Sequence, residues 1–245
     1  MITPAHIQGH WVRDWIKAPG FEDHTTRVHW MQAGDIYADV RIPHTRPNAV
    51  GATCLADLNP AALTTLAKAE GFAGTTTLDG DTCTWLREIN WHGTPDEPDV
   101  GAISFDVEGR MIETGVHADY SELWTQKAKG TTAARCFSND TFIGVLVCAA
   151  DVGVLGIGQP VKPATTPARD ALNRGTIPDN ADTVFDGLHA LCKVDGPRVT
   201  AVLATNPFVE TQTILTLGET DVTWHKTGFD GTQQNIHLPI TRTTE

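Results

Sequence analysis

The chain has 245 residues, with 18 Lys and Arg against 30 Asp and Glu, so its formal net charge at pH 7 is −12. This length accommodates one large all-β domain or two domains of about 120 residues each. The acidic balance makes nucleic acid and anionic membrane surfaces poor partners, because both carry charge of the same sign.

The N-terminal residues contain no basic run followed by an apolar segment, and no apolar stretch approaches the roughly 18 residues that cross a bilayer. The sequence therefore predicts a soluble, cytoplasmic protein. Its five cysteines are an odd number, are widely spaced and form no C-x-x-C pair. This pattern favours reduced thiols over a disulfide framework or a zinc site.

Short segments with alternating or apolar patterning follow one another along the chain, and many are separated by an acidic residue next to glycine. Such pairs suit tight hairpins, since glycine tolerates a positive φ. The pattern predicts a mostly antiparallel β-protein, with candidate strands at 9–16, 26–33, 35–42, 74–79, 82–91, 99–107, 110–117, 141–148, 152–157, 198–205, 208–217, 221–228 and 234–241.

One helix is predicted over residues 61–70, because Asn59 can cap it, Pro60 suits the first turn and Gly71 provides a stop. We expect this helix to plug or flank a barrel end. A second short helix is predicted over residues 168–174, inside a Pro-rich stretch that otherwise has the character of a long loop over 158–182. This loop is either a lid over a binding site or an ordered surface excursion.

The strand pattern is interrupted around residues 127–133, where lysines, glycine and threonine replace it. We therefore predict two parts, residues 1–129 and residues 130–245, each forming an antiparallel β-barrel or half-barrel. No clear sequence repeat relates the two halves.

Three segments of the first half place large polar and aromatic side chains on one strand face. The alternating residues are Trp11, Arg13 and Trp15, then Trp30 and Gln32, then Tyr37, Asp39 and Arg41. The opposite face of the third segment is apolar, with Ile36, Ala38, Val40 and Ile42. Both faces are committed to packing, as in a small barrel with a polar and aromatic interior, so the sequence predicts a lined cavity.

Several short motifs carry a resemblance to a known family. They are Gly-His-Trp at 9–11, Phe-Ala-Gly-Thr at 72–75, Cys-Thr-Trp-Leu at 83–86, Glu-Thr-Gly at 113–115 and Tyr-Ser-Glu-Leu-Trp at 120–124. Their order and spacing resemble a lipocalin-like, calycin-type family of uncharacterised bacterial proteins, related to a small fungal cytosolic casein-kinase-interacting protein. The resemblance covers residues 9–125 and fades afterwards. It implies an all-β fold of two lipocalin-like barrels or half-barrels with one or two short helices, and it supplies no catalytic residues.

Two further strands are expected to face the same interior. Strand 82–91 places Trp85, Arg87, Ile89 and Trp91 on one face, and strand 110–117 does the same with Met111, Glu113, Gly115 and His117. A buried arginine needs a partner, so we expect Arg41 and Arg87 to pair with Asp39, Glu113 or a ligand anion. The alternative is a filled barrel closed by internal salt bridges, with Trp11 and Trp85 as ordinary core residues.

Three residues are candidates for chemistry. Glu113 is the first choice for a carboxylate that moves a proton, because a partly dry aromatic chamber raises the pKa of a carboxyl towards neutrality. His117, predicted on the same strand face, could relay the proton, and Tyr37 could donate to a developing oxyanion. The corresponding structural interpretations are an ion pair for Glu113 and a simple hydrogen bond at the barrel rim for Tyr37.

Other site classes leave no trace in the sequence. No H-x-H, H-E-x-x-H, G-x-S-x-G, Walker or dinucleotide-binding glycine motif occurs. The sequence therefore predicts neither a metal site nor a cofactor.

These patterns lead to one expected function and two alternatives. The first is a protein that holds a partly apolar, anionic small molecule in a barrel cavity, with Trp11, Arg13, Trp30, Asp39, Arg41, Trp85 and Arg87 as ligand-binding residues. The second is a cofactor-independent lyase, hydratase or isomerase that uses Glu113 as acid or base. The third is a protein-interaction module that presents strand edges of the second half, or loop 158–182, to a protein partner. The sequence leaves the ligand and the oligomeric state open.

Overall fold

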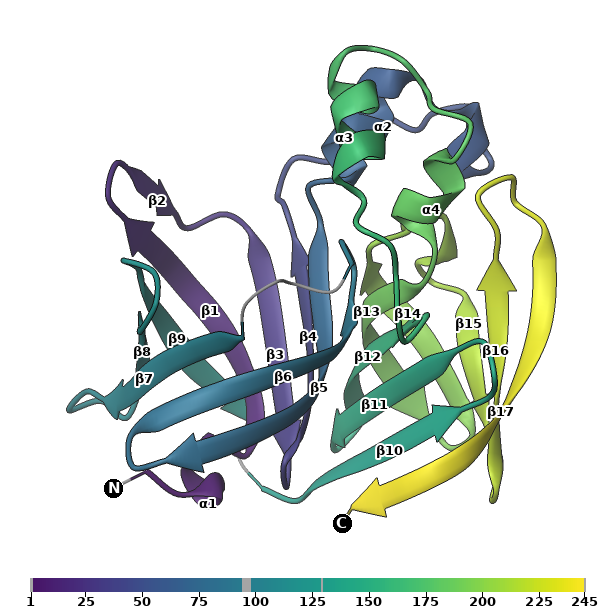
Figure 1. Ribbon diagram of the computed structural model, residues 1–245. Coiled ribbons are helices and arrows are strands. Elements are labelled where there is room, and N and C mark those ends of the chain that lie inside the picture. Colours follow the sequence, from purple (N-terminus) through teal and green to yellow (C-terminus); the bar gives the residue numbers. More distant parts are fainter. Residues whose placement is uncertain (1, 94–97, 129, 245) are drawn as a thin grey trace.

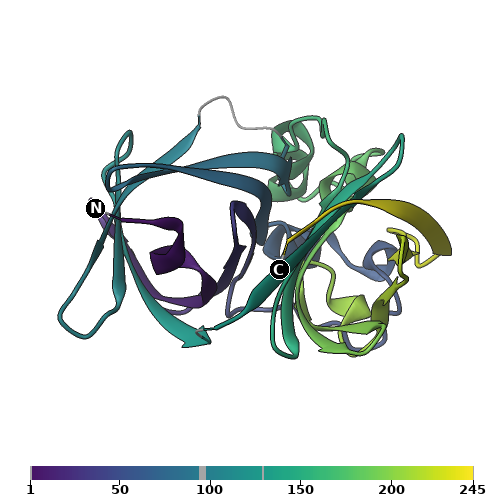
Figure 2. The ribbon, with the colours of Figure 1, turned by 90° about the horizontal axis from the view of Figure 1, so that it is seen from below.

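The computed structural model describes residues 2–93, 98–128 and 130–244. In this part of the chain, two closed antiparallel barrels stand side by side (Figure 1). The view from below shows both barrels end-on (Figure 2). The predicted all-β fold class is confirmed.

The first barrel is closed by its first and last long strands. It consists of β1 (Gly9–Ala18), β3 (Arg27–Ala33), β4 (Ile36–Ile42), β5 (Glu70–Asp79), β6 (Thr82–Asn90), β7 (Asp99–Phe105), β8 (Met111–Gly115) and β9 (Ser121–Ala128). Strand β1 pairs with both β3 and β9, and the short β2 (Phe21–Asp23) extends the sheet beside the end of β1. Helix α1 (Pro4–Ile7) lies across the lower end of this barrel (Figure 2), where the Trp11 Nε1 donates to the carbonyl of Ile7 at 2.9 Å.

The second barrel follows after a short crossing. It consists of β10 (Thr132–Ser138), β11 (Ile143–Ala149), β12 (Val152–Gly158), β13 (Leu188–Asp195), β14 (Arg198–Ala204), β15 (Thr213–Leu217), β16 (Asp221–Thr227) and β17 (Gln233–Thr244), which pairs back with β10. Its interior is apolar, with Leu155, Val199 and Leu238 fully buried. The crossing between the barrels falls within the interruption predicted at 127–133; residue 129, at the expected boundary, lies outside the described residues.

The candidate strands missed β13 and the short β2, and also β9 and β10, the two strands that flank this crossing. Strand β9 carries Glu122 with 1% of its surface exposed, and a charged residue at a buried position hides the alternation that marks a strand. Strand β10 is a run of small and polar residues without a strong period. The candidate strand at 208–217 was also too long, because a 3₁₀ helix, η2 (Pro207–Val209), precedes the start of β15 at Thr213.

The predicted helices are present, with corrected ends. In α2 (Pro60–Leu66), the Asn59 side chain accepts a hydrogen bond from the Ala62 backbone N–H at 2.9 Å, as expected for a cap. The helix stops before residue 70, because β5 already begins there and Gly71 lies within that strand. The second predicted helix is α3 (Thr166–Asn173), whereas α4 (Ala181–Phe185) and the 3₁₀ helix η1 (Leu55–Asp57) were not expected. Figure 1 shows α2, α3 and α4 gathered at the same end of the molecule.

The outer faces of the two barrels pack against each other. The apolar face of β4, with Ile36, Ala38, Val40 and Ile42, belongs to a buried cluster that includes Val147 and Val154 from the second barrel. The prediction that both faces of this strand are packed is therefore confirmed: one lines the first barrel and the other meets the second.

The β4–β5 connection of the first barrel also reaches over to the second. The backbone N–H of Ala56 donates to the carbonyl of Phe229 at 3.0 Å, and the Arg46 Nη2 donates to the Glu210 Oε1 at 2.6 Å. Strand packing and this connection together hold the barrels as one body. None of the described helices is long and apolar enough to cross a membrane.

Candidate functional site

A polar and aromatic chamber lies inside the first barrel. Its lining, which defines the term chamber below, is Trp30, Tyr37, Asp39, Arg41, Phe72, Trp85, Asp99, Glu113 and Trp124. The Trp30 ring meets the rings of both Trp85 and Trp124 edge-on, with centroids 5.9 Å apart in each case. Trp30, Tyr37, Asp39, Arg41 and Trp85 were all predicted as site residues, and the fold brings them to one cavity.

Two arginines and two carboxylates form a continuous network beside this cavity. The Arg41 Nε donates to the Asp39 Oδ1 at 3.0 Å, and the Arg41 Nη1 lies 3.6 Å from the Glu122 Oε1. The Arg13 Nη1 donates to the same Glu122 oxygen at 2.5 Å. Both guanidinium groups are therefore already matched by carboxylates of the chain, without an external anion.

A second ion pair stands at a more exposed position. Arg87 pairs with Asp99 rather than with Glu113, and its guanidinium stacks 3.6 Å from the centroid of the Phe72 ring. The side chains of Arg87 and Asp99 retain 19% and 23% of their exposure, compared with 4% for Asp39. This pair is thus the more accessible part of the chamber wall.

Glu113 is buried without an arginine partner. It lies directly opposite Glu122 on β8 and β9, and Gly101 leaves room for it, since a Cβ there would come within 2.9 Å of the Glu113 Cγ. The Tyr120 hydroxyl donates to the Glu113 Oε1 at 2.8 Å. Burial, together with the negative charge of Glu122, raises the pKa of Glu113 to about 8. At neutral pH this carboxyl is therefore mostly protonated.

The charge balance of this region is negative. Burial raises the pKa of Asp39 to about 6 despite its contact with Arg41. In the chamber and its adjoining network, which includes Asp23 at 3.6 Å from the Arg13 Nη2, five carboxyl groups stand against three arginines: Asp23, Asp39, Asp99, Glu113 and Glu122 against Arg13, Arg41 and Arg87. With Glu113 protonated, four carboxyl groups still outnumber the three arginines. An added anion would meet no unmatched positive charge here.

Several polar atoms around the chamber have no hydrogen-bond partner among the described residues. They include the indole Nε1 of Trp30 and of Trp124 and the hydroxyl of Tyr37, which are 2%, 1% and 1% exposed. Buried donors without partners are uncommon in proteins. The cavity that these residues line has a volume of only about 10 Å³, which suits a single water-sized group.

One predicted site residue lies elsewhere. His117 was expected on the inner face of strand 110–117, but β8 ends at Gly115 and His117 is exposed in the following turn. The chain reverses because the Gly115 N–H donates to the carbonyl of Tyr120 at 3.0 Å. The prediction of His117 as a proton relay on this face is therefore wrong.

Two bulges redirect other residues that a strict alternation placed inside. A register shift between Arg13 and Trp15 in the β1–β9 pairing leaves Trp15 half-buried under Lys17. Another shift, in the β5–β6 pairing, sends Ile89 outward to the second barrel. Trp11 is buried but packs at the end near α1, and it does not line the chamber.

The sequence did not indicate several residues that line the chamber or contact its lining. Glu122 and Trp124 lie on β9, which was not among the candidate strands. Asp99 and Tyr120 stand at strand edges, and Phe72 is on β5 beyond the expected start of that strand. The Tyr-Ser-Glu-Leu-Trp run at 120–124 was noticed as a family motif, and its alternation would have placed Glu122 and Trp124 on the same face.

A much larger cavity opens at the mouth of the second barrel. It has a volume of about 910 Å³ and is lined by residues from 159–163, 177–186 and 226–232, together with Phe142. We call it the lid cleft, because the predicted loop 158–182 supplies much of its wall. Aromatic rings of Phe142, Phe185 and Phe229 contribute to the lining, and the last two lie 5.8 Å apart.

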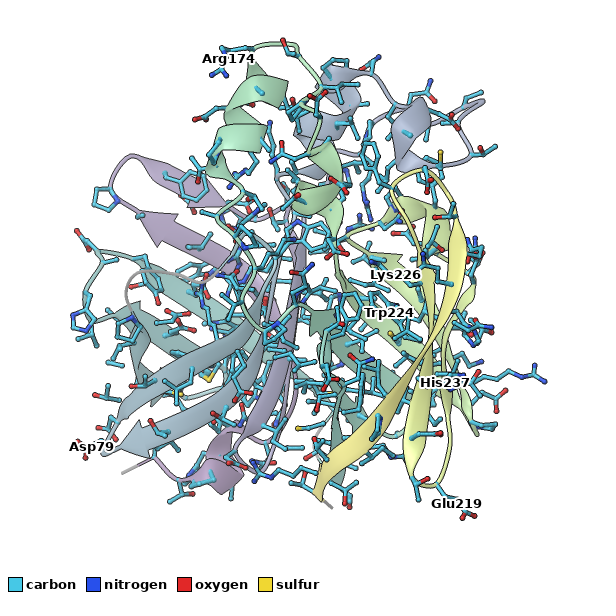
Figure 3. All side chains as sticks on the ribbon, turned by 45° about the vertical axis from the view of Figure 1, so that its right-hand side comes forward. Asp79, Arg174, Glu219, Trp224, Lys226 and His237 are labelled. Carbon is cyan, nitrogen blue, oxygen red and sulfur yellow. The ribbon has the colours of Figure 1, made fainter. Side chains whose placement is uncertain are left out.

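Two lysines of the lid cleft are held by the protein itself. The Lys226 Nζ lies 2.8 Å from the Asp186 Oδ1, and Figure 3 shows Lys226 close to Trp224 on β16. The Lys162 Nζ is buried and donates to the carbonyls of Val184 and Asp186 at 3.2 and 2.7 Å. Burial lowers the pKa of Lys162 to about 8.

Metal-ligating side chains are not grouped in the described ranges 2–93, 98–128 and 130–244. No cluster of three or more His, Cys, Asp or Glu is placed there to hold a metal ion. Such side chains meet in pairs, for example the His10 Nε2 and the His29 Nδ1, which are 3.0 Å apart.

Comparisons with known proteins establish the fold alone. No family model matches the chain, and no curated protein matches it at a significant level. Among solved structures, the crystal structure of an uncharacterised protein of Saccharomyces cerevisiae, YLR301w, is similar over 98% of this chain and 100% of that chain. The TM-score is 0.58 and the sequence identity is 11%. The two proteins therefore share the two-barrel architecture.

Proposed function

We propose that the protein binds a partly apolar small molecule, and that the binding site is the lid cleft. The observation that carries this proposal is its volume of about 910 Å³, which falls in the range of about 300–1,000 Å³ typical of ligand sites. The chamber predicted from sequence has room for only about one water molecule in this conformation. We therefore keep small-molecule binding as the expected function, but we place the binding site in the second barrel and not in the first.

The lining of the lid cleft suits such a ligand. The rings of Phe185 and Phe229 provide an apolar surface, and the Lys226–Asp186 pair supplies polar groups at its edge. Asp186 also accepts a hydrogen bond from the Gln159 Nε2 at 2.6 Å, so this carboxylate is held in place. Fixed polar groups beside aromatic rings are the usual composition of a pocket that orients a small molecule.

The test uses an uncharged fluorescent probe, N-phenyl-1-naphthylamine. Its emission should rise in a saturable way with the wild-type protein, and Phe229→Ala should weaken binding about tenfold, since a large part of the aromatic contact is lost. Phe21→Ala is the matched control, because Phe21 is 57% exposed on β2 of the other barrel. No saturable response from the wild type, or equal affinity in Phe229→Ala, would refute the proposal.

A second candidate function is proton transfer in the chamber by Glu113. It is favoured by the raised pKa of this buried carboxyl, about 8, and by its hydrogen bond from Tyr120. A carboxyl that keeps its proton at neutral pH is suited to act as a general acid. For any compound that the protein converts, Glu113→Gln should preserve binding and abolish turnover. Equal loss of both would count against this role.

Two finer assignments are part of the proposal. We propose membership of the lipocalin-like, calycin-type family, supported by the closed barrel and by Trp11 of the Gly-His-Trp triplet packing near its end. We also propose a cytoplasmic location, which is supported by the free state of the five cysteines.

A further inference from the structure

The chamber of the first barrel is a second, independent site, and its chemistry differs from that of the lid cleft. We propose that it binds a compact, uncharged molecule with hydrogen-bond-accepting oxygen or nitrogen atoms, such as a small amide or another carbonyl compound. This inference does not depend on the lid cleft, and it supplies the ligand class that the second candidate function lacks.

The buried polar atoms of the chamber that lack a partner are mainly hydrogen-bond donors. The indole N–H groups of Trp30 and Trp124 can only donate, and the Tyr37 hydroxyl has no acceptor among the described residues. All three residues line the same cavity. Leaving a buried donor unpaired is costly, so a ligand with accepting lone pairs recovers free energy that no apolar ligand can recover.

Each arginine in and beside the chamber is paired with a carboxylate of the protein. Arg13 and Arg41 are matched by Glu122 and Asp39, and Arg87 is matched by Asp99. A carboxylate ligand would have to displace one of these acidic groups and would add to an already negative region. The expectation of an anionic ligand is therefore replaced by that of an uncharged one.

Glu113 adds a further hydrogen-bond donor to the chamber. Its neutral carboxyl offers an O–H donor to the same cavity, while one of its oxygens accepts from the Tyr120 hydroxyl at 2.8 Å. A cationic ligand would gain from an ionised Glu113, but burial and the facing Glu122 oppose ionisation. Three protein donors and one neutral acid favour an acceptor over an amine.

Size limits the ligand to a few heavy atoms. The cavity of about 10 Å³ takes one water-sized group as it stands. The Arg87–Asp99 pair is partly exposed, so we infer that a slightly larger molecule enters the cavity by displacing this pair. Neither side chain is fixed by deep burial.

The experiment compares three probes of similar size: acetamide, acetate and methylammonium. The readout is the indole ¹H–¹⁵N signals of Trp30 and Trp124 at pH 7. Acetamide should shift both signals in a saturable way and bind at least fivefold more tightly than either ion. Tyr37→Phe should weaken acetamide about fivefold, since one hydrogen bond is lost, and Glu113→Gln should retain binding because its amide still donates.

Each contrary outcome is informative. Tighter binding of acetate or methylammonium would overturn the ligand class while leaving a chamber site in place. No saturable shift with any probe would overturn the chamber site itself, and the naphthylamine titration of the lid cleft would be unaffected. Should Tyr37→Phe fail to fold, the ranking of the three probes on the wild type still decides the question.

Discussion

Two facing glutamates in the first barrel differ in their charged partners, and this difference bears on the protonation of Glu113. Glu122 accepts from Arg13 and lies near Arg41, which stabilise its charge, whereas Glu113 has only the hydroxyl of Tyr120. Two buried carboxylates in contact cannot both ionise cheaply, so the one without guanidinium partners keeps the proton.

This difference makes stability depend on pH in a defined direction. The pKa of Glu113 is about 8 in the folded protein and 4.5 ordinarily. The contribution of Glu113 to the free energy of unfolding is complete below pH 4.5. It is lost as the pH rises towards 8, because the unfolded state releases the proton first. Between pH 6.5 and 8, above the pKa of about 6 for Asp39, the free energy of unfolding of wild type should fall by about 1 kcal/mol per pH unit relative to Glu113→Gln.

Urea unfolding at several pH values measures this effect. Glu108→Gln is a suitable control, because Glu108 is exposed in a turn and should follow the wild type. Parallel pH profiles for wild type and Glu113→Gln would show that Glu113 is ionised in the folded protein. That result would also remove the basis for its role as an acid.

At the residue scale, the sequence indicated the inward arginines, Glu113 and the Arg41–Asp39 pair, but not Asp99 as the partner of Arg87 or Glu122 as the partner of Arg13. Alternation shows which side chains share a face, yet pairing between strands decides which charges meet. Arg87 was expected beside Glu113, but the β6–β7 and β7–β8 pairings place Asp99 and Glu113 at different positions around the barrel. Such neighbours are separated in sequence and leave no local signal.

At the scale of single strands, bulges are the main reason why the predicted face and the observed face differ. The shift in the β5–β6 pairing occurs beside Gly74, where a Cβ would come within 2.0 Å of the Leu86 carbonyl oxygen. After it, Ile89 points to the second barrel and Trp91 packs with the helices. Periodicity cannot reveal an inserted residue. The face of strand 82–91 that was predicted to line the barrel therefore wrongly included Ile89 and Trp91.

Strand β5 also depends on a glycine at the contact between the barrels. A Cβ on Gly71 would lie 2.1 Å from the Cγ of His189, which is fully buried. Gly71→Ala should therefore destabilise the protein by about 1–3 kcal/mol or more, because the histidine ring has no free space to move into. Gly158→Ala is the matched control, since its new methyl group would have an ordinary contact of 3.4 Å with Ile89.

Thermal and urea unfolding of both variants test this packing. The expected order of stability is wild type equal to Gly158→Ala, with Gly71→Ala clearly lower. If Gly71→Ala were as stable as wild type, the close contact between β5 and β13 would not exist as described, and the packing of the barrels would need revision.

At the scale of the whole molecule, the two barrels have the same architecture but different interiors. The second has a continuous apolar core, whereas the first holds indole rings and ion pairs. The composition of the sequence favoured an all-β fold with two halves, and the polar alternation of the first half was visible in advance. The lid cleft could not be predicted from the sequence, because it forms where loop 158–182 meets turns that are far away in the sequence.

Buried histidines give the whole molecule a second pH dependence, on the acid side. Burial lowers the pKa of His10, His29 and His92 to about 4 and that of His189 to about 3, from 6.5. The contribution of these histidines to the free energy of unfolding is complete above pH 6.5. It is lost as the pH falls, since the unfolded state takes up protons first. These four groups outnumber Glu113 and Asp39, whose effect is opposite, so unfolding at pH 5.5 should take up roughly two protons.

The slope of unfolding free energy against pH between 4.5 and 6.5 gives this number directly. Stability should rise with pH over that interval, and His10→Gln should reduce the slope, whereas His117→Gln should not, because His117 is exposed. A flat or falling profile would mean that the histidines are accessible to water in the folded protein.

The proposed function rests on where a ligand sits, so the most direct measurement is a crystal structure of the protein grown with N-phenyl-1-naphthylamine. We expect density for the probe in the lid cleft, beside Phe185 and Phe229 and next to the Lys226–Asp186 pair. Density inside the first barrel instead, with the rings of Trp30 and Trp85 moved apart, or a lid cleft without the probe at saturating concentration, would contradict it.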